Sequence, residues 1–381
     1  MRFICYLVIA IWNFNQKRVK AMKRNYYIFT PGRLRRKQNT IYFEQMAGDP
    51  HGLQPENTEE CFDLYDDFEA ETDDRDQVQC KPIPIEDIES FYCFGEITFN
   101  SKFLNFLAQN NIPLHVFNYY GYYSGSYYPR EYLVSGFLTV NQVQHYLDKQ
   151  KRLTLAKEFI ATAVDNLLRN LKYYKTRKEG VEAWADTVEG NITDMKTINS
   201  IHELMGYEGR MRAAYYRSFS EILNMDVDFK KRVRRPPDNM INALISFGNA
   251  MVYTTCLSEI YRTQLNPTIS FLHEPGERRF SLSLDLAEVF KPLLADRTIF
   301  KLLNTKMLNE KHFDQKLNSC YLDEKGRKIF VKEFDERLKT TIFHRTLKRK
   351  VSYRRLIRLE CYKLIKHLTG ERQYKGFRAW W

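Results

Sequence analysis

Four residues of the chain have the chemistry of a metal or acid–base site: Glu208, His273, Asp285 and Glu288. Asp285 and Glu288 stand three residues apart in a run with helical spacing, which predicts that both carboxylates lie on one helix face. His273 follows two apolar residues and precedes a Glu-Pro-Gly turn. An imidazole near two or three carboxylates is a suitable donor set for Mg²⁺ or Mn²⁺, and the nitrogen ligand favours Mn²⁺.

The same residues also have simpler structural interpretations. Asp285 followed by Glu288 before an apolar run is the pattern of a capping box at a helix start. Glu208 stands four residues before Arg212, the spacing of an ordinary helical ion pair. A single histidine after two apolar residues is more often an interior or surface imidazole than a ligand. Spacing alone therefore leaves both the metal site and these structural roles open.

The elements that would carry these residues are helical. After Pro129, apolar residues recur every three or four positions, which is the period of amphipathic helices. The pattern predicts helices over residues 153–171, 196–223, 238–263, 284–308 and 330–368. The expected fold class is α+β, with an N-terminal β-sheet domain over residues 22–130 and a larger, mostly α-helical domain over residues 131–381. A chain of 381 residues also favours two domains over a single core.

The N-terminal part has the short period of strands. Aromatic and β-branched runs between turn signals predict a β-meander from residue 25 to 45 and a further strand over 81–88. Helical spacing fills residues 100–110, and a Tyr- and Gly-rich hairpin is expected over 112–129. Its tyrosines are expected to pack a sheet or a dimer face, and the alternative is that they stack on splayed bases. The group Arg33, Arg35, Arg36 and Lys37 in the meander is either a protected sheet edge or a phosphate contact.

Charge is distributed unevenly along the chain. The formal net charge is +12, yet residues 46–79 hold twelve acidic residues against one arginine, which leaves about +23 on the remainder. A surplus of this size favours a polyanionic partner, because neutralised phosphates release their counterions. The acidic segment is interpreted as a surface insertion or flexible loop. A sharper hypothesis is that it imitates DNA and screens a basic groove.

Two basic clusters in the helical part are candidates for contacts with the DNA backbone. No helix-turn-helix or other base-reading motif accompanies them, so recognition by DNA shape is expected. From Lys339 onward the chain has thirteen basic residues against two acids. The candidate residues are Lys230, Lys231, Arg232, Arg234 and Arg235 in a loop, and Arg354, Arg355 and Arg358 on a helix.

Other classes of protein are disfavoured. The seven cysteines are scattered without a Cys-x-x-Cys pair, which indicates reduced cytoplasmic thiols and no zinc site. The apolar run over residues 3–12 is too short to span a membrane, for which about 20 residues are needed. Residues 1–21 are interpreted as a start-site extension, with a signal or interfacial anchor as the alternative.

Three motifs in a fixed order resemble the CRISPR-associated Cas1 family, the integrase of spacer acquisition. They are Tyr207-Glu208-Gly209, the segment from Asn266-Pro267 to His273, and Ser283-Leu284-Asp285-Leu286-Ala287-Glu288-Val289-Phe290-Lys291-Pro292. The likeness continues over residues 101–131 and 374–381, and is similar to the branch that accompanies type I-B systems. It covers roughly residues 22–45 and 80–381.

This resemblance implies a reaction and a site. Glu208, His273 and Glu288 match the metal ligands of the family, and Asp285 matches its supporting carboxylate. Glu288 is longer than the Asp of some relatives by one methylene, so the choice of Asp285 or Glu288 as the direct ligand stays open. The implied nucleophile is the 3′-hydroxyl of a prespacer DNA end, which attacks a phosphodiester at the edge of a CRISPR repeat.

The resemblance also implies partners. They are double-stranded DNA, a second copy in a homodimer, and a Cas2 dimer that bridges two such homodimers into a heterohexamer. Two other functions stay open: a stand-alone metal-dependent DNA or RNA endonuclease, and a non-catalytic nucleic-acid-binding scaffold whose carboxylates form only caps and ion pairs.

Overall fold

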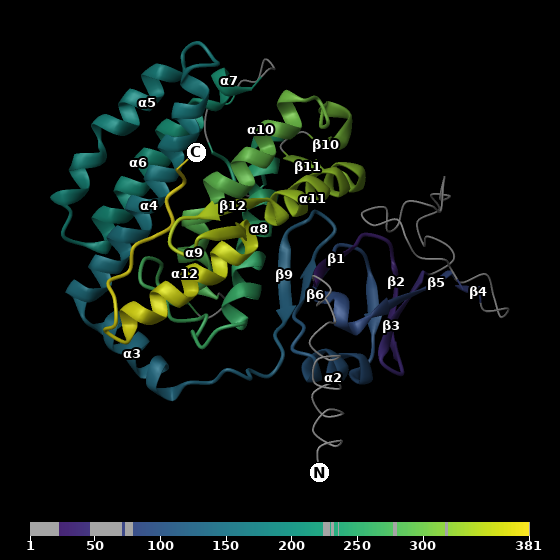
Figure 1. Ribbon diagram of the computed structural model, residues 1–381. Helices are drawn as coiled ribbons and strands as arrows, with labels where there is room; N and C mark the ends of the chain where they lie inside the picture. Colours follow the sequence, from purple (N-terminus) through teal and green to yellow (C-terminus); the bar gives the residue numbers. More distant parts are fainter. Residues whose placement is uncertain are drawn as a thin grey trace, which may run out of the picture. The chain divides into compact units, whose positions relative to one another are not determined.

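A computed structural model describes residues 23–45, 71–72, 79–223, 229, 232–234, 236–276, 280–316 and 319–380. The chain forms two compact units, Met1–Phe117 with Gly125–Arg130, and Asn118–Ser124 with Glu131–Trp381. The first unit is rich in strands and the second is mostly helical (Figure 1), which confirms the predicted α+β class. Residues 1–21, predicted as an extension, lie outside the described residues.

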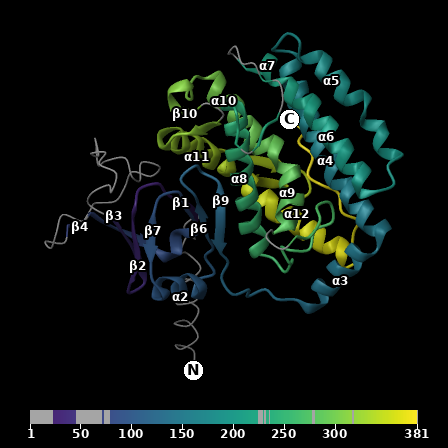
Figure 2. The same ribbon diagram turned by 180° about the vertical axis from the view of Figure 1, so that it is seen from behind.

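The strands of the N-terminal unit form two sheets. One has the order β1-β6-β8-β9, and the other has the order β4-β5-β3-β2-β7. Figure 2 labels β1, β6 and β9 of the first sheet and β2, β3 and β7 of the second. In the first sheet β1 pairs parallel with β6, and β6 pairs parallel with β8. The strands are β1 (Arg24–Ile28), β2 (Gly32–Lys37), β3 (Thr40–Gln45), β4 (Glu71–Thr72), β5 (Gln79–Pro84), β6 (Ile88–Cys93), β7 (Ile97–Phe99), β8 (Leu114–Phe117) and β9 (Tyr123–Tyr127).

The predicted β-meander over residues 25–45 is wrong in its pairing. β2 and β3 form the expected antiparallel hairpin, but β1 lies in the other sheet beside β6. The partner of β1 is more than sixty residues away in sequence, so local patterning does not indicate it. Within the acidic segment 46–79, β4 pairs antiparallel with β5, and residues 46–70 and 73–78 lie outside the described part.

Helix α2 (Ser101–Gln109) has one apolar and one polar face. The Asn100 side chain caps its start by accepting from the Phe103 amide at 3.1 Å. Phe103, Phe106 and Leu107 are buried in a core shared with strand residues such as Leu34 and Phe43. The predicted helix over residues 100–110 is therefore confirmed, and its polar face stays exposed.

The C-terminal unit is built around α8 (Met240–Tyr261), which packs against α9, α10 and α12. This helix has the length and composition of a membrane span, but 78% of its most apolar window is buried inside the unit, as expected for a core helix. The other helices are α3 (Gly136–Leu147), α4 (Lys149–Lys175), α5 (Val181–Gly190), α6 (Ile201–Arg217), α7 (Phe219–Ile222), α9 (Ser281–Lys291), α10 (Arg297–Asn304), α11 (Glu324–Lys339) and α12 (Tyr353–Leu368).

Two β-hairpins interrupt the helical unit. The prediction of one helical pattern over residues 330–368 is wrong, because β12 (Thr341–His344) and β13 (Arg349–Ser352) separate α11 from α12. The run Thr340-Thr341-Ile342-Phe343 is β-branched and aromatic, and Ser352 caps the next helix. The second hairpin consists of β10 (Phe313–Lys316) and β11 (Ser319–Leu322).

The tyrosines of the predicted hairpin mostly pack against other rings or backbone. The rings of Tyr120 and Tyr321 lie 4.5 Å apart, and Tyr123 contacts Tyr253 edge-on at 5.3 Å. Tyr119 is 75% exposed. Stacking of these tyrosines on nucleic acid bases has no support from this packing.

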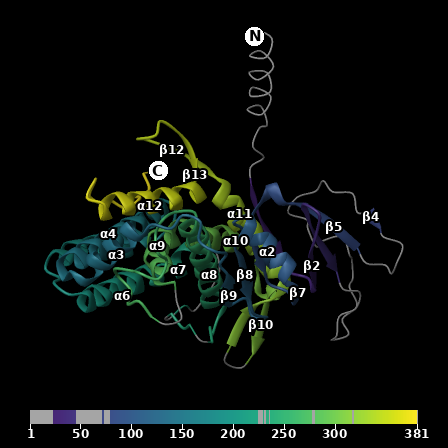
Figure 3. The ribbon, with the colours of Figure 1, turned by 90° about the horizontal axis from the view of Figure 1, so that it is seen from below.

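The C-terminal segment is fixed on α4 and α12 (Figure 3). Asn166 of α4 donates to the Phe377 carbonyl at 2.9 Å and to the Val289 carbonyl at 3.0 Å, which joins this segment to α9. Gly376 lies so close to α4 that a Cβ there would be 2.2 Å from the Thr162 hydroxyl. The C-terminus therefore helps to hold the helix that carries Asp285 and Glu288.

Candidate metal centre

Helix α6 presents Glu208 and Arg212 from its partly buried face. Ser200 caps the helix by accepting from the Glu203 amide at 3.2 Å. Glu208 and Arg212 are one helical turn apart, so both reach the same space. Their side chains are 18% and 9% exposed, respectively.

The capping-box interpretation of Asp285 is wrong. Helix α9 begins at Ser281, so Asp285 and Glu288 lie in its interior and are almost fully buried. A buried carboxylate requires hydrogen-bond donors, and those of Asp285 come from outside its own helix.

Asp285 organises the loop that carries His273. Its Oδ2 accepts from the backbone amides of Phe271 at 2.7 Å and Leu272 at 3.0 Å. Its Oδ1 accepts from the His273 amide at 3.0 Å and contacts His273 Nδ1 at 2.8 Å. Four contacts occupy this carboxylate, which is 0% exposed. A proton on Nδ1 leaves Nε2 as the ring nitrogen available for a ligand, the usual arrangement of carboxylate, histidine and metal.

The two glutamates of the site meet at one arginine. Arg212 Nε donates to Glu208 Oε1 at 2.5 Å, and Arg212 Nη2 donates to Glu288 Oε2. Lys291, one turn after Glu288, donates to its other oxygen. Burial alone would raise the pKa of Glu288, but the positive charges of Arg212, Lys291 and His273 lower it to about 2. One guanidinium thus bridges the glutamates of α6 and α9.

Burial and neighbouring charges have opposite effects on the pKa of His273. Burial lowers the pKa of His273, but the hydrogen bond and negative charge of Asp285, together with the charge of Glu288, raise the pKa above its ordinary value. Asp285 and Glu288 stand three residues apart on α9, so this helix carries both the partner of His273 and the partner of Arg212. The structure therefore brings Glu208, His273, Asp285 and Glu288 to one site, together with Arg212 and Lys291.

The donor chemistry of this site fits a divalent cation. Two carboxylates and an imidazole with a fixed Nδ1 are the ligands expected of Mg²⁺ or Mn²⁺. Among the described residues, however, no three His, Cys, Asp or Glu side chains are grouped closely enough to hold an ion as they stand. Arg212 already neutralises both glutamates. A bound cation would therefore replace the guanidinium between them.

Comparisons with known proteins assign this chain to a family. The sequence profile described as "CRISPR associated protein Cas1" matches residues 26–336. A "CRISPR-associated endonuclease Cas1" of Fusobacterium nucleatum is 48% identical over 360 residues, which covers 94% of this chain and 98% of the relative. This chain belongs to the Cas1 family. A solved Cas1 structure from Thermotoga maritima superposes with a TM-score of 0.78 and 38% identity, covering 93% of this chain and all of that one.

Two more distant solved structures share the Cas1 fold. One is described as a casposase bound to integration product, with a TM-score of 0.74 and 20% identity over 94% of this chain and 93% of that chain. The other is a chain of a Cas6-RT-Cas1–Cas2 complex, with a TM-score of 0.75 and 14% identity over 96% of this chain and 37% of that chain. At these identities the likeness shows the fold alone.

Sequence reasoning missed three charged residues around this Cas1 site. The sequence indicates Arg212 only as the helical ion-pair partner of Glu208. Lys291 stands three residues after Glu288, a spacing that indicates a second ion pair. Asp296 ends a π-helical turn (Pro292–Asp296) that directly follows α9. No helical period points to Asp296, because the π turn shifts its direction relative to α9.

Asp296 is a buried carboxylate without the usual partners. It is 0% exposed, and among the described residues neither oxygen has a hydrogen-bond partner of ordinary geometry. Burial raises the pKa of Asp296 to about 7, and the charge of Arg212 and the Tyr215 hydroxyl offset this rise only in part.

Stability of the Cas1 fold should therefore fall as pH rises from about 4 to 8. The folded state holds the Asp296 proton up to about pH 7, whereas the unfolded state releases it near 3.8, so the folded state binds more protons in this window. The free energy of unfolding falls by about 4 kcal/mol over this window. Asp296→Asn should remove this pH dependence and raise stability at pH 8, measured by urea unfolding at pH 5 and pH 8. The exposed Asp186→Asn is the control, and equal pH dependence in both variants would contradict the assignment.

The structure gives the predicted basic residues different surroundings. Lys230, Lys231 and Arg235 lie outside the described residues, and Arg234 is exposed. Arg232 is fixed to α8 through Asn242 Oδ1 at 2.9 Å and Ser246 Oγ at 2.8 Å.

The three arginines of α12 also differ from one another. Arg354 pairs with the buried Asp335 at 3.3 Å and Arg358 with the buried Glu259 at 2.6 Å. Arg355 lies 6.0 Å from the centre of the Tyr362 ring. Arg354 and Arg358 thus neutralise interior carboxylates, and a role of these residues in DNA binding stays a prediction.

Four of the cysteines lie in the core of the described part of the chain. Cys93, Cys256, Cys320 and Cys361 are buried free thiols. Burial raises the pKa of Cys93 to about 12. Within the described part of the chain these thiols are therefore unreactive core residues.

Proposed function

We propose that this chain is a metal-dependent DNA integrase of CRISPR adaptation. The observation that carries the proposal is the contact of Arg212 with the partly buried Glu208 and the buried Glu288, beside a histidine whose Nδ1 is fixed by Asp285. Membership of the Cas1 family and the fold shared with a casposase support it. Relatives of this chain are named endonucleases, so hydrolysis is the related activity expected when water replaces the DNA end.

The site residues divide into ligands and positioning groups. Glu208, Glu288 and Nε2 of His273 would hold Mg²⁺ or Mn²⁺, which supplies charge for the scissile phosphate and its leaving oxygen. Asp285 is assigned to orientation of the imidazole, because all of its contacts are to the 271–273 loop. Lys291 is close enough to Glu288 to balance part of the negative charge of this carboxylate when the cation is bound. This assignment makes Glu288 the direct ligand and Asp285 its support.

The proposed reaction exchanges one phosphodiester for another. The 3′-oxygen of a prespacer end attacks a repeat phosphate, its proton passes to solvent, and a new bond from this oxygen to phosphorus forms. The bond from phosphorus to the repeat strand's own 3′-oxygen breaks, which leaves a 3′-hydroxyl. No energy source is needed, because the number of phosphodiesters is unchanged, and the protein contributes position and charge.

The proposed partners are DNA and proteins of the same system. The casposase structure is described with its integration product, and another structure of this fold is described as a complex with Cas2. For this chain we infer double-stranded prespacer and repeat DNA, a homodimer, and a Cas2 dimer that bridges two homodimers. The net charge of +12 supports a polyanionic partner.

Loss of the imidazole tests the proposal. Strand transfer of a labelled DNA with free 3′-hydroxyl ends into a repeat-containing plasmid is measured with Mn²⁺ and the cognate Cas2 protein. His273→Ala should lower the rate by about 10³-fold, since loss of several kcal/mol of charge stabilisation corresponds to tenfold per 1.36 kcal/mol. DNA binding should persist, because His273 contacts Asp285 rather than a surface groove.

The matched control is His202→Ala on the exposed face of α6. Joined products at equal rates in both variants would remove His273 from catalysis. A wild-type protein that cuts DNA without joining it would indicate a stand-alone endonuclease. If His273→Ala changes only the melting temperature, the scaffold function is favoured.

A further inference from the structure

The N-terminal unit has an open cavity lined by polar side chains. It has a volume of about 450 Å³ and is lined by Arg36, Gln38, Lys102, Asn105 and Gln109. All five lining side chains are exposed, so the cavity is open to solvent. Two cations and three carboxamides line the cavity without a carboxylate, so its chemistry suits an anion that also accepts hydrogen bonds.

Helix α2 supplies three of the lining residues from its exposed face. Lys102, Asn105 and Gln109 follow one another at three and four residues, which places them in one row along the helix. The opposite face, with Phe103, is buried in the core. The row therefore rests on a rigid support.

Arg36, at the end of β2, is held ready for a ligand. Its guanidinium lies over the Phe106 ring, 4.2 Å from the centroid, and its Nε donates to the Gln38 carbonyl at 2.8 Å. Gln38 has a left-handed backbone with φ of 54°, an uncommon conformation for this residue type. Stacking and the Nε bond fix the guanidinium while its two terminal nitrogens keep their donors.

The two cations of this cavity are not neutralised by the protein. Within the part of the chain that the structure describes, neither Arg36 nor Lys102 forms an ion pair, whereas the neighbouring Arg35 pairs with Glu44. Lys37, next on the strand, lies 5.2 Å from the centre of the Tyr42 ring. Two uncompensated cations that converge on one cavity favour a phosphate as the ligand.

We infer that this cavity binds a phosphodiester of a nucleic acid strand. Arg36 and Lys102 hold the phosphate, and the carboxamides of Gln38, Asn105 and Gln109 bond to neighbouring sugar or base groups. A strand is favoured over a free phosphate because the cavity is open and its lining side chains are exposed, so that an extended strand can cross it. The inference rests on the proposed function for the identity of the strand as DNA.

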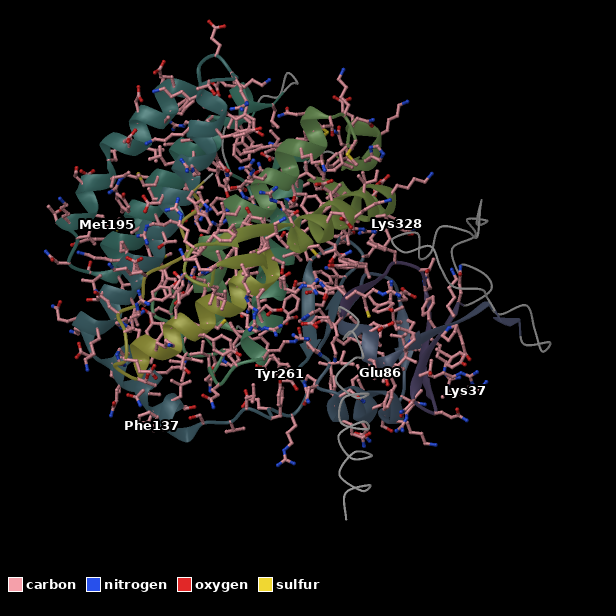
Figure 4. All side chains as sticks on the ribbon, in the orientation of Figure 1. Lys37, Glu86, Phe137, Met195, Tyr261 and Lys328 are labelled. Carbon is pink, nitrogen blue, oxygen red and sulfur yellow. The ribbon has the colours of Figure 1, made fainter. Side chains whose placement is uncertain are left out.

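The test compares DNA binding by full-length variants. Fluorescence anisotropy is measured across a salt series for a duplex and a single strand, with Arg36→Gln/Lys102→Gln and with the control Lys37→Gln. Lys37 has the same charge and lies at the outer edge of the unit (Figure 4), but does not line the cavity. The double variant should bind about tenfold more weakly, and its salt slope should fall by about one, for the one lost phosphate contact. Equal affinities and slopes for the double variant and the control would overturn the inference.

A second measurement separates DNA from free phosphate. Side-chain amide signals of Asn105 and Gln109 are followed by NMR during titration with inorganic phosphate and with a short oligonucleotide. Shifts with the oligonucleotide at lower concentration than with phosphate support the inference, and shifts with phosphate alone overturn it. Strand transfer by the double variant at saturating DNA should equal that of wild type. Loss of strand transfer by the double variant at saturating DNA would overturn the assignment of the cavity to DNA binding. Failure of the proposed function would instead appear as unchanged strand transfer in His273→Ala.

Discussion

Arg212→Met is expected to destabilise the protein by about 3–5 kcal/mol in the presence of EDTA, because it leaves the partly buried Glu208 without its counter-charge and removes one of the two cations on the buried Glu288. Arg212 bridges Glu208 and Glu288, and their negative charges raise its pKa well above the ordinary value despite burial. Lys291 remains on Glu288 and limits the loss. The expected result is measured by urea unfolding at pH 7.

Added Mn²⁺ should restore most of this loss. A cation that binds the folded state stabilises it by about 2.7 kcal/mol at a hundred times its dissociation constant. The wild-type protein should gain less, because the ion must first displace Arg212 from both glutamates. The control is Arg210→Met on the exposed side of α6. A variant that is destabilised but insensitive to Mn²⁺ would show that the two glutamates do not form a metal site.

Asp285→Asn is the second substitution with a large expected effect. An amide in place of the carboxylate offers one acceptor where four donors converge, so it leaves buried amides of the 271–273 loop unpaired. The cost in free energy of unfolding should be about 3–5 kcal/mol. The affinity for Mn²⁺ should fall by about 10- to 100-fold, as for other losses of a group that orients a metal-binding histidine.

Isothermal titration with Mn²⁺ and urea unfolding measure these two effects. Glu274→Gln serves as the control, because Glu274 is an exposed neighbour of His273 that pairs with Arg152 at 2.7 Å. Unchanged Mn²⁺ affinity in a folded Asp285→Asn protein would show that His273 needs no orientation by this carboxylate. Weaker Mn²⁺ binding together with reduced stability would support Asp285 as a positioning residue.

Local patterns of the sequence determined most of the helices. The three- to four-residue apolar period located α2, α4, α6 and α8, since each buries one face or its whole surface against a core and therefore repeats apolar residues at the helical period. The fold class and the four candidate site residues also followed from the sequence, the residues through motifs that resemble the Cas1 family. The direct role of each residue did not follow from spacing.

Tertiary structure alone decided how strands pair and which charges meet. β1 found a partner across more than sixty residues, and the hairpin β12–β13 divided an apparently continuous helical pattern, because strand pairing depends on distant neighbours. Asp285 serves a loop twelve residues earlier instead of its own helix start. Arg212 joins α6 to α9 over 76 residues. Spacing along one helix gives the face on which a charge lies, but only packing between helices brings its partner within hydrogen-bond distance.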